Sequence, residues 1–136
     1  INNQKIPIYG NGKNIRDWIF VIDHCKIIYK LMISNKFNND KFLIGSNNEI
    51  SNIELVNILL KILQKKTGKQ NLNKLIEFVG DRPNHDFRYS INSKFVKKLL
   101  KYRFNNFENS LENTIDYYLN NNLKKTKYYD YSSIKY

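Results

Sequence analysis

Residues 7–24, PIYGNGKNIRDWIFVIDH, hold two apolar runs that a glycine-containing loop separates. The first run, residues 7–9, is followed by Gly10 and Gly12, which predicts a short strand that ends in a tight loop. The second run, residues 18–22, is β-branched and aromatic and predicts a buried strand. Two strands in this order, with a loop between them, indicate a domain that contains a sheet.

The apolar spacing becomes helical from Asp23 onward, which predicts a helix over residues 23–34. Asp23 lies near the start of this helix, where a carboxylate complements the positive end of the helix dipole. The apolar positions that recur at helical intervals are Cys25, Ile28, Tyr29 and Met32.

Further helices and one more strand follow along the chain. Ser51 and Glu54 have the spacing of a capping box, and the helix behind them should end near Gly68. Residues 75–79 predict a strand, residues 93–102 a short helix, and the residues after Asn106 a last helix. Short strands that alternate with about four helices predict the α/β class.

Length and composition set limits on the kind of protein. A chain of 136 residues is enough for one domain, which we place at residues 1–122, followed by an irregular Lys- and Tyr-rich tail at 123–136. No apolar run approaches the roughly 18 residues of a membrane span, and the single Cys25 forms no internal disulfide. We therefore expect a cytoplasmic protein that has no membrane partner.

The formal net charge of +11 has two interpretations. It could mark a basic nucleic-acid-binding module. Alternatively, a genome rich in A and T raises the use of Lys, Asn, Ile and Tyr together, without any functional meaning. The lysines are scattered along the chain and form no long block, which favours the second interpretation and predicts no nucleic-acid partner.

Residues 81–89, DRPNHDFRY, are the strongest candidate for a binding site. They hold two of the four arginines of the chain and form a loop around Pro83. Arg82 could bind phosphate, Asp81 could accept a hydrogen bond from a ribose hydroxyl, and His85 could donate or accept one. The alternative is a structural loop in which Asp86 and Arg88 merely pair.

Arg16 and Asn52 are two further candidates. Arg16 follows the glycine loop, and its planar guanidinium suits diphosphate oxygens; alternatively, it pairs with a surface carboxylate such as Asp17. Asn52 comes at the start of a helix, where free backbone N–H groups could help to bind a ligand; alternatively, it is an ordinary exposed residue. His24 and Cys25 stand without further clustered ligands, so we predict no metal site.

Four segments carry a resemblance to a known family. These segments are PIYGNGKNIRDWIFVIDH at 7–24, IGSNNEISN at 44–52, FVGDRPNHDFRYSIN at 78–92 and FENSLENTIDYYL at 107–119. In this order they resemble the C-terminal part of the dTDP-glucose 4,6-dehydratases, which are NAD-dependent enzymes of the extended short-chain dehydrogenase/reductase superfamily. The resemblance runs from about Lys5 to Leu119 and departs from the family at Asn84, where Gly is usual, and at Leu43, where Asn is usual.

The resemblance implies a fold and a function for the whole protein. The fold would be the C-terminal substrate-binding part of a Rossmann-type enzyme, and NAD would be bound by an N-terminal domain that this chain lacks. The whole protein would be a homodimeric lyase that converts dTDP-glucose to dTDP-4-keto-6-deoxyglucose, with NAD as transient hydride acceptor. An epimerase or decarboxylase of the same superfamily is the alternative within this class.

The resemblance also implies roles for single residues. The implied nucleotide-sugar contacts are Pro7, Ile8, Tyr9, Arg16, Asn52, Asp81, Arg82 and His85. No catalytic residue and no NAD-binding residue is expected in this chain, because it has no glycine-rich fingerprint. Its Tyr-x-x-x-Lys string at 131–135 lies in the irregular tail, so we expect this chain alone to be inactive.

Overall fold

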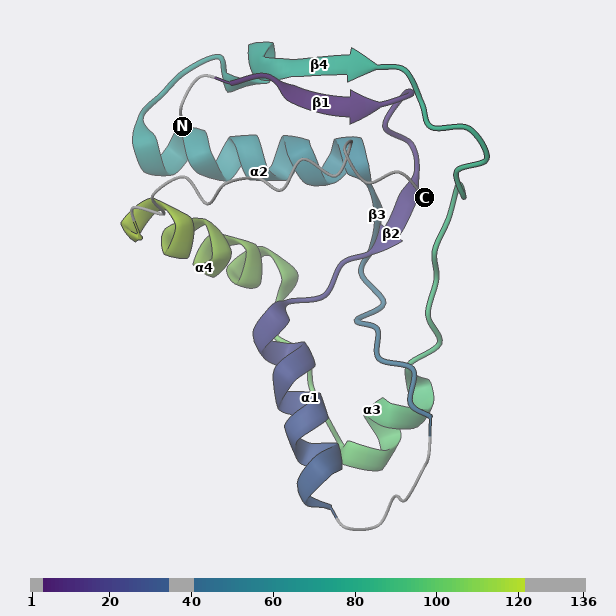
Figure 1. Cartoon of the computed structure of the whole chain (residues 1–136). Coiled ribbons are helices and arrows are strands. Elements are labelled where there is room, and N and C mark those ends of the chain that lie inside the picture. Colours follow the sequence, from purple (N-terminus) through teal and green to yellow (C-terminus); the bar gives the residue numbers. More distant parts are fainter. Residues whose placement is uncertain (1–3, 35–40, 122–136) are drawn as a thin grey trace.

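The computed structural model describes residues 4–34 and 41–121, which form short strands and four α-helices (Figure 1). The strands are β1 (Ile6–Tyr9), β2 (Ile15–Asp17), β3 (Glu49–Ser51) and β4 (Ile76–Val79). The helices are α1 (Val21–Ile33), α2 (Asn52–Thr67), α3 (Lys94–Leu100) and α4 (Phe107–Asn120), with a 3-10 turn at Leu72–Leu75. The predicted α/β class with about four helices is confirmed. The predicted tail at 123–136 lies outside the described residues.

Two small sheets organise the strands. β1 and β4 pair in parallel, with Ile6 opposite Ile76 and Tyr9 opposite Val79. β2 and β3 pair antiparallel, with Arg16 opposite Ile50. Figure 1 shows β1 and β4 lying over α2, with α4 below α2, while α1 and α3 extend away from this part of the molecule.

The strand predicted at residues 18–22 is wrong. The strand in this region is β2, at Ile15–Asp17, and α1 begins at Val21. β3 pairs with β2 as far as Asp17, and beyond it the described part of the chain adds a single backbone hydrogen bond between the two segments, from the Trp18 amide to the Asn48 carbonyl at 3.0 Å. Without a longer ladder, the β-branched residues 21 and 22 enter the first turn of a helix instead.

The helix ends follow the predicted signals. The Ser51 hydroxyl accepts from the Glu54 amide at 3.3 Å, and the Glu54 carboxylate accepts from the Ser51 amide at 2.8 Å, which completes the capping box of α2. Gly68 ends α2 in the left-handed conformation at φ 70°. The Asn106 side chain caps α4 by accepting from the Asn109 amide at 3.1 Å.

The buried core is small and lies mainly between β1, α2 and α4. Its apolar members are Ile8, Ile27, Leu55, Leu60, Ile62, Val96 and Ile115. α2 and α4 also line an apolar groove of about 450 Å³, which residues 18–20 close at one end. No helix within the described ranges 4–34 and 41–121 is long and apolar enough to cross a membrane.

The apolar stripe of α1 faces solvent instead of the core. The buried residues of α1 are Asp23 and Ile27, whereas Cys25, Ile28, Tyr29 and Met32 are exposed. Asp23 does more than complement the helix dipole, because it is 1% exposed and accepts hydrogen bonds from Tyr102 and Asn105. α3 likewise buries Val96 but exposes Phe95.

Candidate nucleotide-binding site

The candidate site lies where β1 and β4 end. Because these strands are parallel, their carboxyl ends meet at one edge of the sheet, where ligand sites of α/β proteins commonly lie. Gly10 follows β1 at φ 55°, and a Cβ there would lie 2.6 Å from the Asp81 carboxylate. Glycine at position 10 therefore lets the loop after β4 approach the loop after β1.

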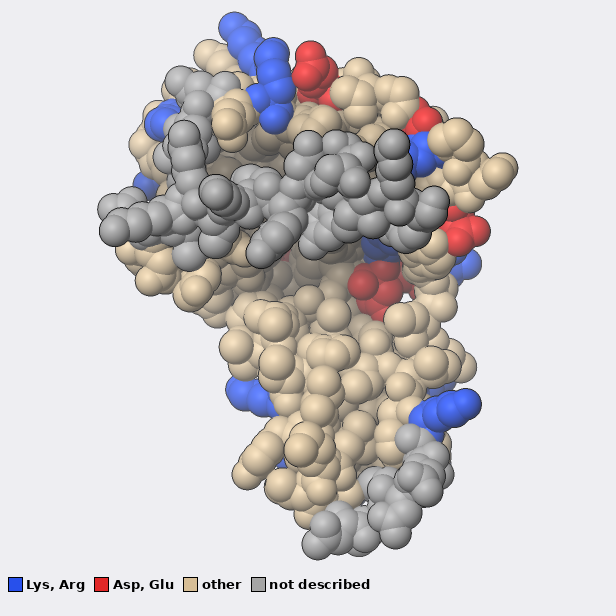
Figure 2. Space-filling view, in the orientation of Figure 1, with Lys and Arg blue, Asp and Glu red and all other residues tan. Residues whose placement is uncertain are grey.

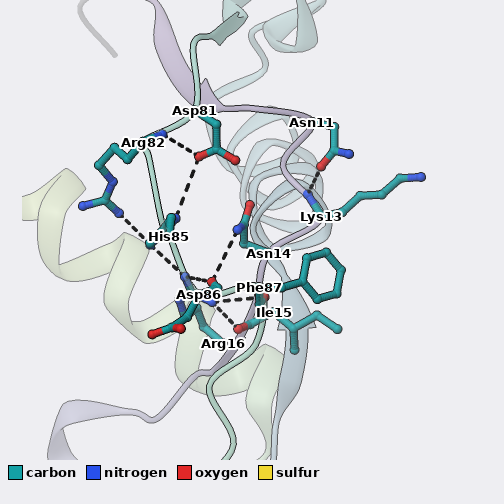
Figure 3. A network of polar contacts seen from close by, with 10 residues as sticks. All are labelled: Asn11, Lys13, Asn14, Ile15, Arg16, Asp81, Arg82, His85, Asp86 and Phe87. Atoms are coloured by element: carbon teal, nitrogen blue, oxygen red, sulfur yellow. Dashed lines mark hydrogen bonds and ion pairs between the residues drawn. The ribbon is translucent and has the colours of Figure 1, made fainter.

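Arg16 is held by the loop that it faces (Figure 3). Its guanidinium donates to the backbone carbonyls of Ile15 at 2.6 Å, Asp86 at 3.0 Å and Phe87 at 3.3 Å. It also lies over the ring of Tyr89, with 4.3 Å between its Cζ atom and the ring centroid. The pairing of Arg16 with Asp17 that was considered as an alternative does not occur, because the Asp17 carboxylate accepts from Ser46 and Asn48.

Arg82 has fewer partners than Arg16. Its Nη2 atom lies 2.9 Å from Nε2 of His85, and its Cζ atom lies 5.3 Å from the ring centroid of Tyr9. The side chain is exposed at the edge of the loop. Among the described residues, no hydrogen-bond partner is found for its other guanidinium nitrogens, so a planar fork of donors faces outward.

His85 joins the two arginines. Nη2 of Arg16 lies 3.0 Å from the same Nε2 atom that Arg82 contacts. A guanidinium has donors only, so Nε2 accepts and the proton of a neutral imidazole sits on Nδ1. Nδ1 is buried without a hydrogen-bond partner in the described part of the chain, and the Asp81 carboxylate is 3.8 Å away.

Two further polar pairs fix the loop on either side of this cluster. Arg88 donates to Glu49 at 2.7 Å, and this hydrogen bond lowers the pKa of the Glu49 carboxyl while it raises the pKa of Arg88. A hydrogen bond to Asp86 raises the pKa of the Tyr89 hydroxyl. The simple Asp86–Arg88 pair that would make this a purely structural loop is therefore not formed, because both residues have other partners.

β1 presents only some of the predicted residues to this edge. Pro7 and Tyr9 are exposed on one face of the strand, and the Tyr9 ring contacts Arg82. Ile8 points to the opposite face and is 4% exposed, because side chains alternate along a strand. The Ile8 side chain is therefore part of the core, and the place of Ile8 in the nucleotide pocket stays a prediction.

Asn52 lies close to the cluster through its backbone. Its amide donates to the carbonyl of Asn14 at 3.1 Å, and the Asn14 side chain donates to the carbonyl of Asp86 at 3.5 Å. The next amide, of Ile53, donates to the carbonyl of Gly12 at 3.0 Å. The expectation of free N–H groups at this helix start is therefore wrong, because the loop 12–14 already occupies them.

Sequence reasoning missed two contributors to the site. Tyr89 supports the Arg16 guanidinium, and Glu49 holds the loop through Arg88. Tyr89 lies inside the quoted stretch 81–89, and its aromatic ring close to arginines was a usable signal. Glu49 is 39 residues from Arg88 along the chain, so no local pattern indicated the pair.

The apolar groove described above is separate from this cluster. None of Arg16, Arg82 or His85 lines the 450 Å³ groove between α2 and α4. Its lining is almost wholly apolar, so it offers nothing to a diphosphate. We therefore identify the candidate site from its convergent charges rather than from the size of a cavity.

Comparison with known proteins bears on the class of the chain. A family model described as GDP-mannose 4,6 dehydratase matches residues 1–114. The chain belongs to this family. The chain spans about 35% of the length of the curated relatives that it matches, and it corresponds to their C-terminal part.

Several similar proteins are dTDP-glucose 4,6-dehydratases. One from Escherichia coli is 37% identical over 127 residues, which cover 89% of this chain and 35% of the relative. The solved structure from Bacillus anthracis, in complex with NAD, has a TM-score of 0.72 at 36% identity and covers 87% of this chain and 35% of that chain. The Streptomyces venezuelae enzyme, also with NAD bound, has a TM-score of 0.76 at 31% identity and covers 88% and 35%.

The residues present here do not fit NAD. A dinucleotide site needs a glycine-rich turn that leads directly into a helix whose first N–H groups are free. Gly10 and Gly12 lead into β2 instead, and the first N–H groups of α2 donate to loop carbonyls and to Ser51. The described residues therefore lack the features of a dinucleotide site.

Proposed function

We propose that this chain is the substrate-binding portion of a dTDP-glucose 4,6-dehydratase. The complete enzyme would convert dTDP-glucose to dTDP-4-keto-6-deoxyglucose with NAD, which a further N-terminal portion would bind. The observation that carries the proposal is the convergence of two guanidiniums on one imidazole nitrogen, at 2.9 Å and 3.0 Å. Such a cluster at the carboxyl end of parallel strands suits a diphosphate flanked by a nucleoside and a sugar.

The two arginines would contribute differently to binding. Arg82 has free donors and would bind the diphosphate oxygens directly. Arg16 uses most of its donors on backbone carbonyls, so it would orient the loop and add positive charge. His85 would hold the Arg82 fork in place until a phosphate oxygen replaces Nε2 as its acceptor.

The remaining candidates would contact the nucleoside. Tyr9 would offer its ring, Pro7 its exposed face and Asn52 its amide, while Ile8 would contribute only backbone. The Asp81 carboxylate would accept from a ribose hydroxyl. The assignments of Tyr9, Asp81 and Asn52 are supported by closeness to the Arg82–His85 pair or to the loop that carries it.

Function is tested in a composite polypeptide, in which the part of the E. coli dTDP-glucose 4,6-dehydratase that precedes the matched region is joined to this chain. We expect the composite polypeptide to form the 4-keto product from dTDP-glucose and this chain alone to form none. Thermal shifts with dTDP, UDP and GDP identify the nucleotide, and we expect the largest shift with dTDP. A larger shift with UDP would favour an epimerase or decarboxylase instead.

Substitution of Arg82 tests the site itself. We expect Arg82→Ala in the composite polypeptide to weaken dTDP binding by about 10- to 100-fold, the usual effect of losing a charged hydrogen bond. Arg103→Ala removes the same charge outside the cluster and should leave binding unchanged. Equal effects of the two substitutions would show that net charge, rather than this cluster, attracts the nucleotide.

The proposal includes a homodimeric, cytoplasmic enzyme without a nucleic-acid partner. Sedimentation of the composite polypeptide tests the dimer. Titration with random oligonucleotides at two salt concentrations tests whether the protein binds nucleic acid. Tight binding that falls steeply with salt and ignores Arg82→Ala would support the nucleic-acid-binding alternative.

A further inference from the structure

The imidazole of His85 accepts hydrogen bonds from two guanidiniums at the same nitrogen. Nη2 of Arg82 lies 2.9 Å from its Nε2 atom, and Nη2 of Arg16 lies 3.0 Å from it. An imidazolium carries a hydrogen on both ring nitrogens and accepts no hydrogen bond, so this arrangement requires a neutral His85. The protonation of His85 and the positions of the two guanidiniums are therefore linked.

The charges that face His85 are of both signs. The two guanidiniums face Nε2, whereas the Asp81 carboxylate lies 3.8 Å from Nδ1. The Asp86 carboxylate is engaged by the Tyr89 hydroxyl. Figure 2 shows positive and negative side chains next to one another on the side of the molecule along which the segment after β4 runs. Because the His85 side chain is only 16% exposed, water screens a new charge beside it only in part.

A bound diphosphate would change the groups that face Nε2. Its charged oxygens accept from a guanidinium more strongly than a neutral imidazole does, so the exposed Arg82 would turn to them. Arg16 would keep its three backbone carbonyls, and the hydrogen that it directs at Nε2 would have the same phosphate as an alternative acceptor. Nε2 would then lie beside phosphate oxygens, which accept but do not donate. Only a protonated Nε2 forms a hydrogen bond with them.

We propose that a diphosphate that binds at this cluster draws a proton from solvent onto Nε2 of His85, so that affinity for the nucleotide sugar rises as the pH falls. This inference rests on the proposed function, because it takes the diphosphate of the substrate as the ligand. One proton joins Nε2, Nδ1 keeps its hydrogen, and no covalent bond of the ligand changes. The imidazolium lies between the Asp81 carboxylate and the phosphate, and both negative charges favour it. Histidine suits this role, because its side chain changes charge between about pH 5 and pH 8.

Calorimetry of the composite polypeptide defined above measures this proton. The ligand is the methyl ester of thymidine 5′-diphosphate, whose phosphates release no proton near neutral pH and which offers no glucose to oxidise. Titrations at pH 7 in two buffers of different ionisation enthalpy, Pipes and Bis-Tris, give the number of protons taken up per bound ligand. We expect on the order of 0.5 proton per ligand at pH 7, because the free and bound states are each mixtures of neutral and protonated forms. Over the range from pH 8 to pH 6 this uptake lowers the Kd by about tenfold.

Two matched substitutions locate the proton. The amide that His85→Gln introduces still accepts from a guanidinium but does not titrate. We expect this variant to take up less than about 0.1 proton and its Kd to change by less than about twofold between pH 6 and pH 8. His24 is the other histidine of the chain, and it lies on α1. His24→Gln should keep the proton uptake and the pH dependence of the parent.

Nitrogen-15 NMR of the parent composite polypeptide gives a second measurement that needs no variant. Addition of the ligand at pH 7 should move one imidazole nitrogen signal from the position of an acceptor toward that of an imidazolium. Equal uptake by the parent and His85→Gln would overturn the inference, because the proton would then bind elsewhere. Binding without uptake and without this signal change would overturn it as well, and so would the absence of binding.

The inference and the proposed function fail in different ways. A composite polypeptide that forms product from dTDP-glucose but takes up no proton at His85 keeps the function and refutes the inference. One that takes up the proton at His85 but forms no product keeps the inference and refutes the function.

Discussion

Arg16 and Arg82 contact the same imidazole nitrogen, yet their surroundings differ. Arg16 is half-buried, donates to three backbone carbonyls and packs on Tyr89. Arg82 is exposed, and within the described residues its guanidinium contacts His85 and the Tyr9 ring. The difference separates a residue that shapes the loop from one that is free to bind a ligand.

Stability measurements should distinguish these two arginines. We expect Arg16→Ala to lower the free energy of unfolding of the chain by about 1–3 kcal/mol, because it removes the hydrogen bonds of a charged donor to the carbonyls of Ile15, Asp86 and Phe87. Arg82→Ala should change that free energy by less than about 0.5 kcal/mol, as for other surface substitutions. Urea unfolding followed by circular dichroism measures both. A larger loss for Arg82→Ala would contradict this assignment.

Glycine at position 10 should be required for the approach of the two loops. Gly10→Ala would place a Cβ 2.6 Å from the Asp81 carboxylate at a positive φ of 55°, so we expect a loss of about 1–3 kcal/mol in the free energy of unfolding. Gly80→Ala is the matched control directly after β4, because a Cβ there meets nothing within 4 Å. Similar melting temperatures for the two variants would refute the requirement.

Asn84 explains how the loop tolerates a departure from its family. It adopts φ 55°, in the left-handed region that glycine adopts most easily. Asn is among the few other residues that enter this region at modest cost. The loop therefore keeps a turn at the position where the family usually has Gly.

Asp23 ties α1 to the segment that follows α3. Its carboxylate accepts from the Tyr102 hydroxyl at 2.8 Å, from the Asn105 amide at 3.1 Å and from the Asn105 side chain at 2.5 Å. Burial, together with the hydrogen bond to Asp23, raises the pKa of Tyr102 to about 12. The bonded form of Tyr102 is therefore the neutral phenol.

The raised pKa of Tyr102 makes this tie sensitive to alkali. The folded state holds the proton to about pH 12, whereas an unfolded tyrosine releases it near about pH 10. The stabilisation is thus complete below about pH 10 and is lost as the pH rises toward 12. We expect the stability difference between the parent chain and Tyr102→Phe to shrink over this range. A stability difference that stays constant from pH 9 to pH 12 would show that the hydrogen bond from Tyr102 to Asp23 does not stabilise the fold.

The start of α2 depends on its capping box. Ser51→Ala removes the acceptor of the Glu54 amide and one donor to the Glu54 carboxylate, so we expect a loss of about 1–2 kcal/mol in the free energy of unfolding. Hydrogen bonds from Ser51 lower the pKa of Glu54, so this contribution is present above about pH 4.5 and is lost as the pH falls through the lowered pKa. Chemical denaturation at pH 7 and pH 3 measures both effects. Equal losses at the two pH values would exclude a contribution from the Glu54 carboxylate.

The described part of the chain exposes many large apolar side chains. They include Tyr29, Met32, Leu43, Phe78 and Phe95. β1 and β4 form a sheet of only two strands, which leaves their outer edges open. Both features suit a portion that packs against further structure.

Solution behaviour should reflect this exposure. We expect the isolated chain to be marginally stable or prone to aggregation, and the double substitution Tyr29→Lys and Met32→Lys to reduce light scattering at equal concentration. The Tyr117→Lys variant controls for the added charge. Reversible two-state melting of the parent chain as a monomer would refute this expectation.

Local patterns were enough to predict most helices and the candidate cluster. Caps at Ser51 and Asn106 and the break at Gly68 act within one turn of chain, so neighbouring residues decide them. The family resemblance and the importance of Arg82 and His85 likewise followed from contiguous residues. The strand predicted at 18–22 failed, because a strand exists only where another strand lies beside it.

Contacts between distant residues required the folded chain. Periodicity found the stripe on α1 but could not tell whether the chain itself covers it, since burial depends on which elements pack together. The meeting of Arg16 with His85, 69 residues later, depends on the parallel register of β1 and β4. The fixed position of Arg16 is likewise a consequence of packing, because its partners Asp86 and Phe87 lie 70 and 71 residues away in the chain.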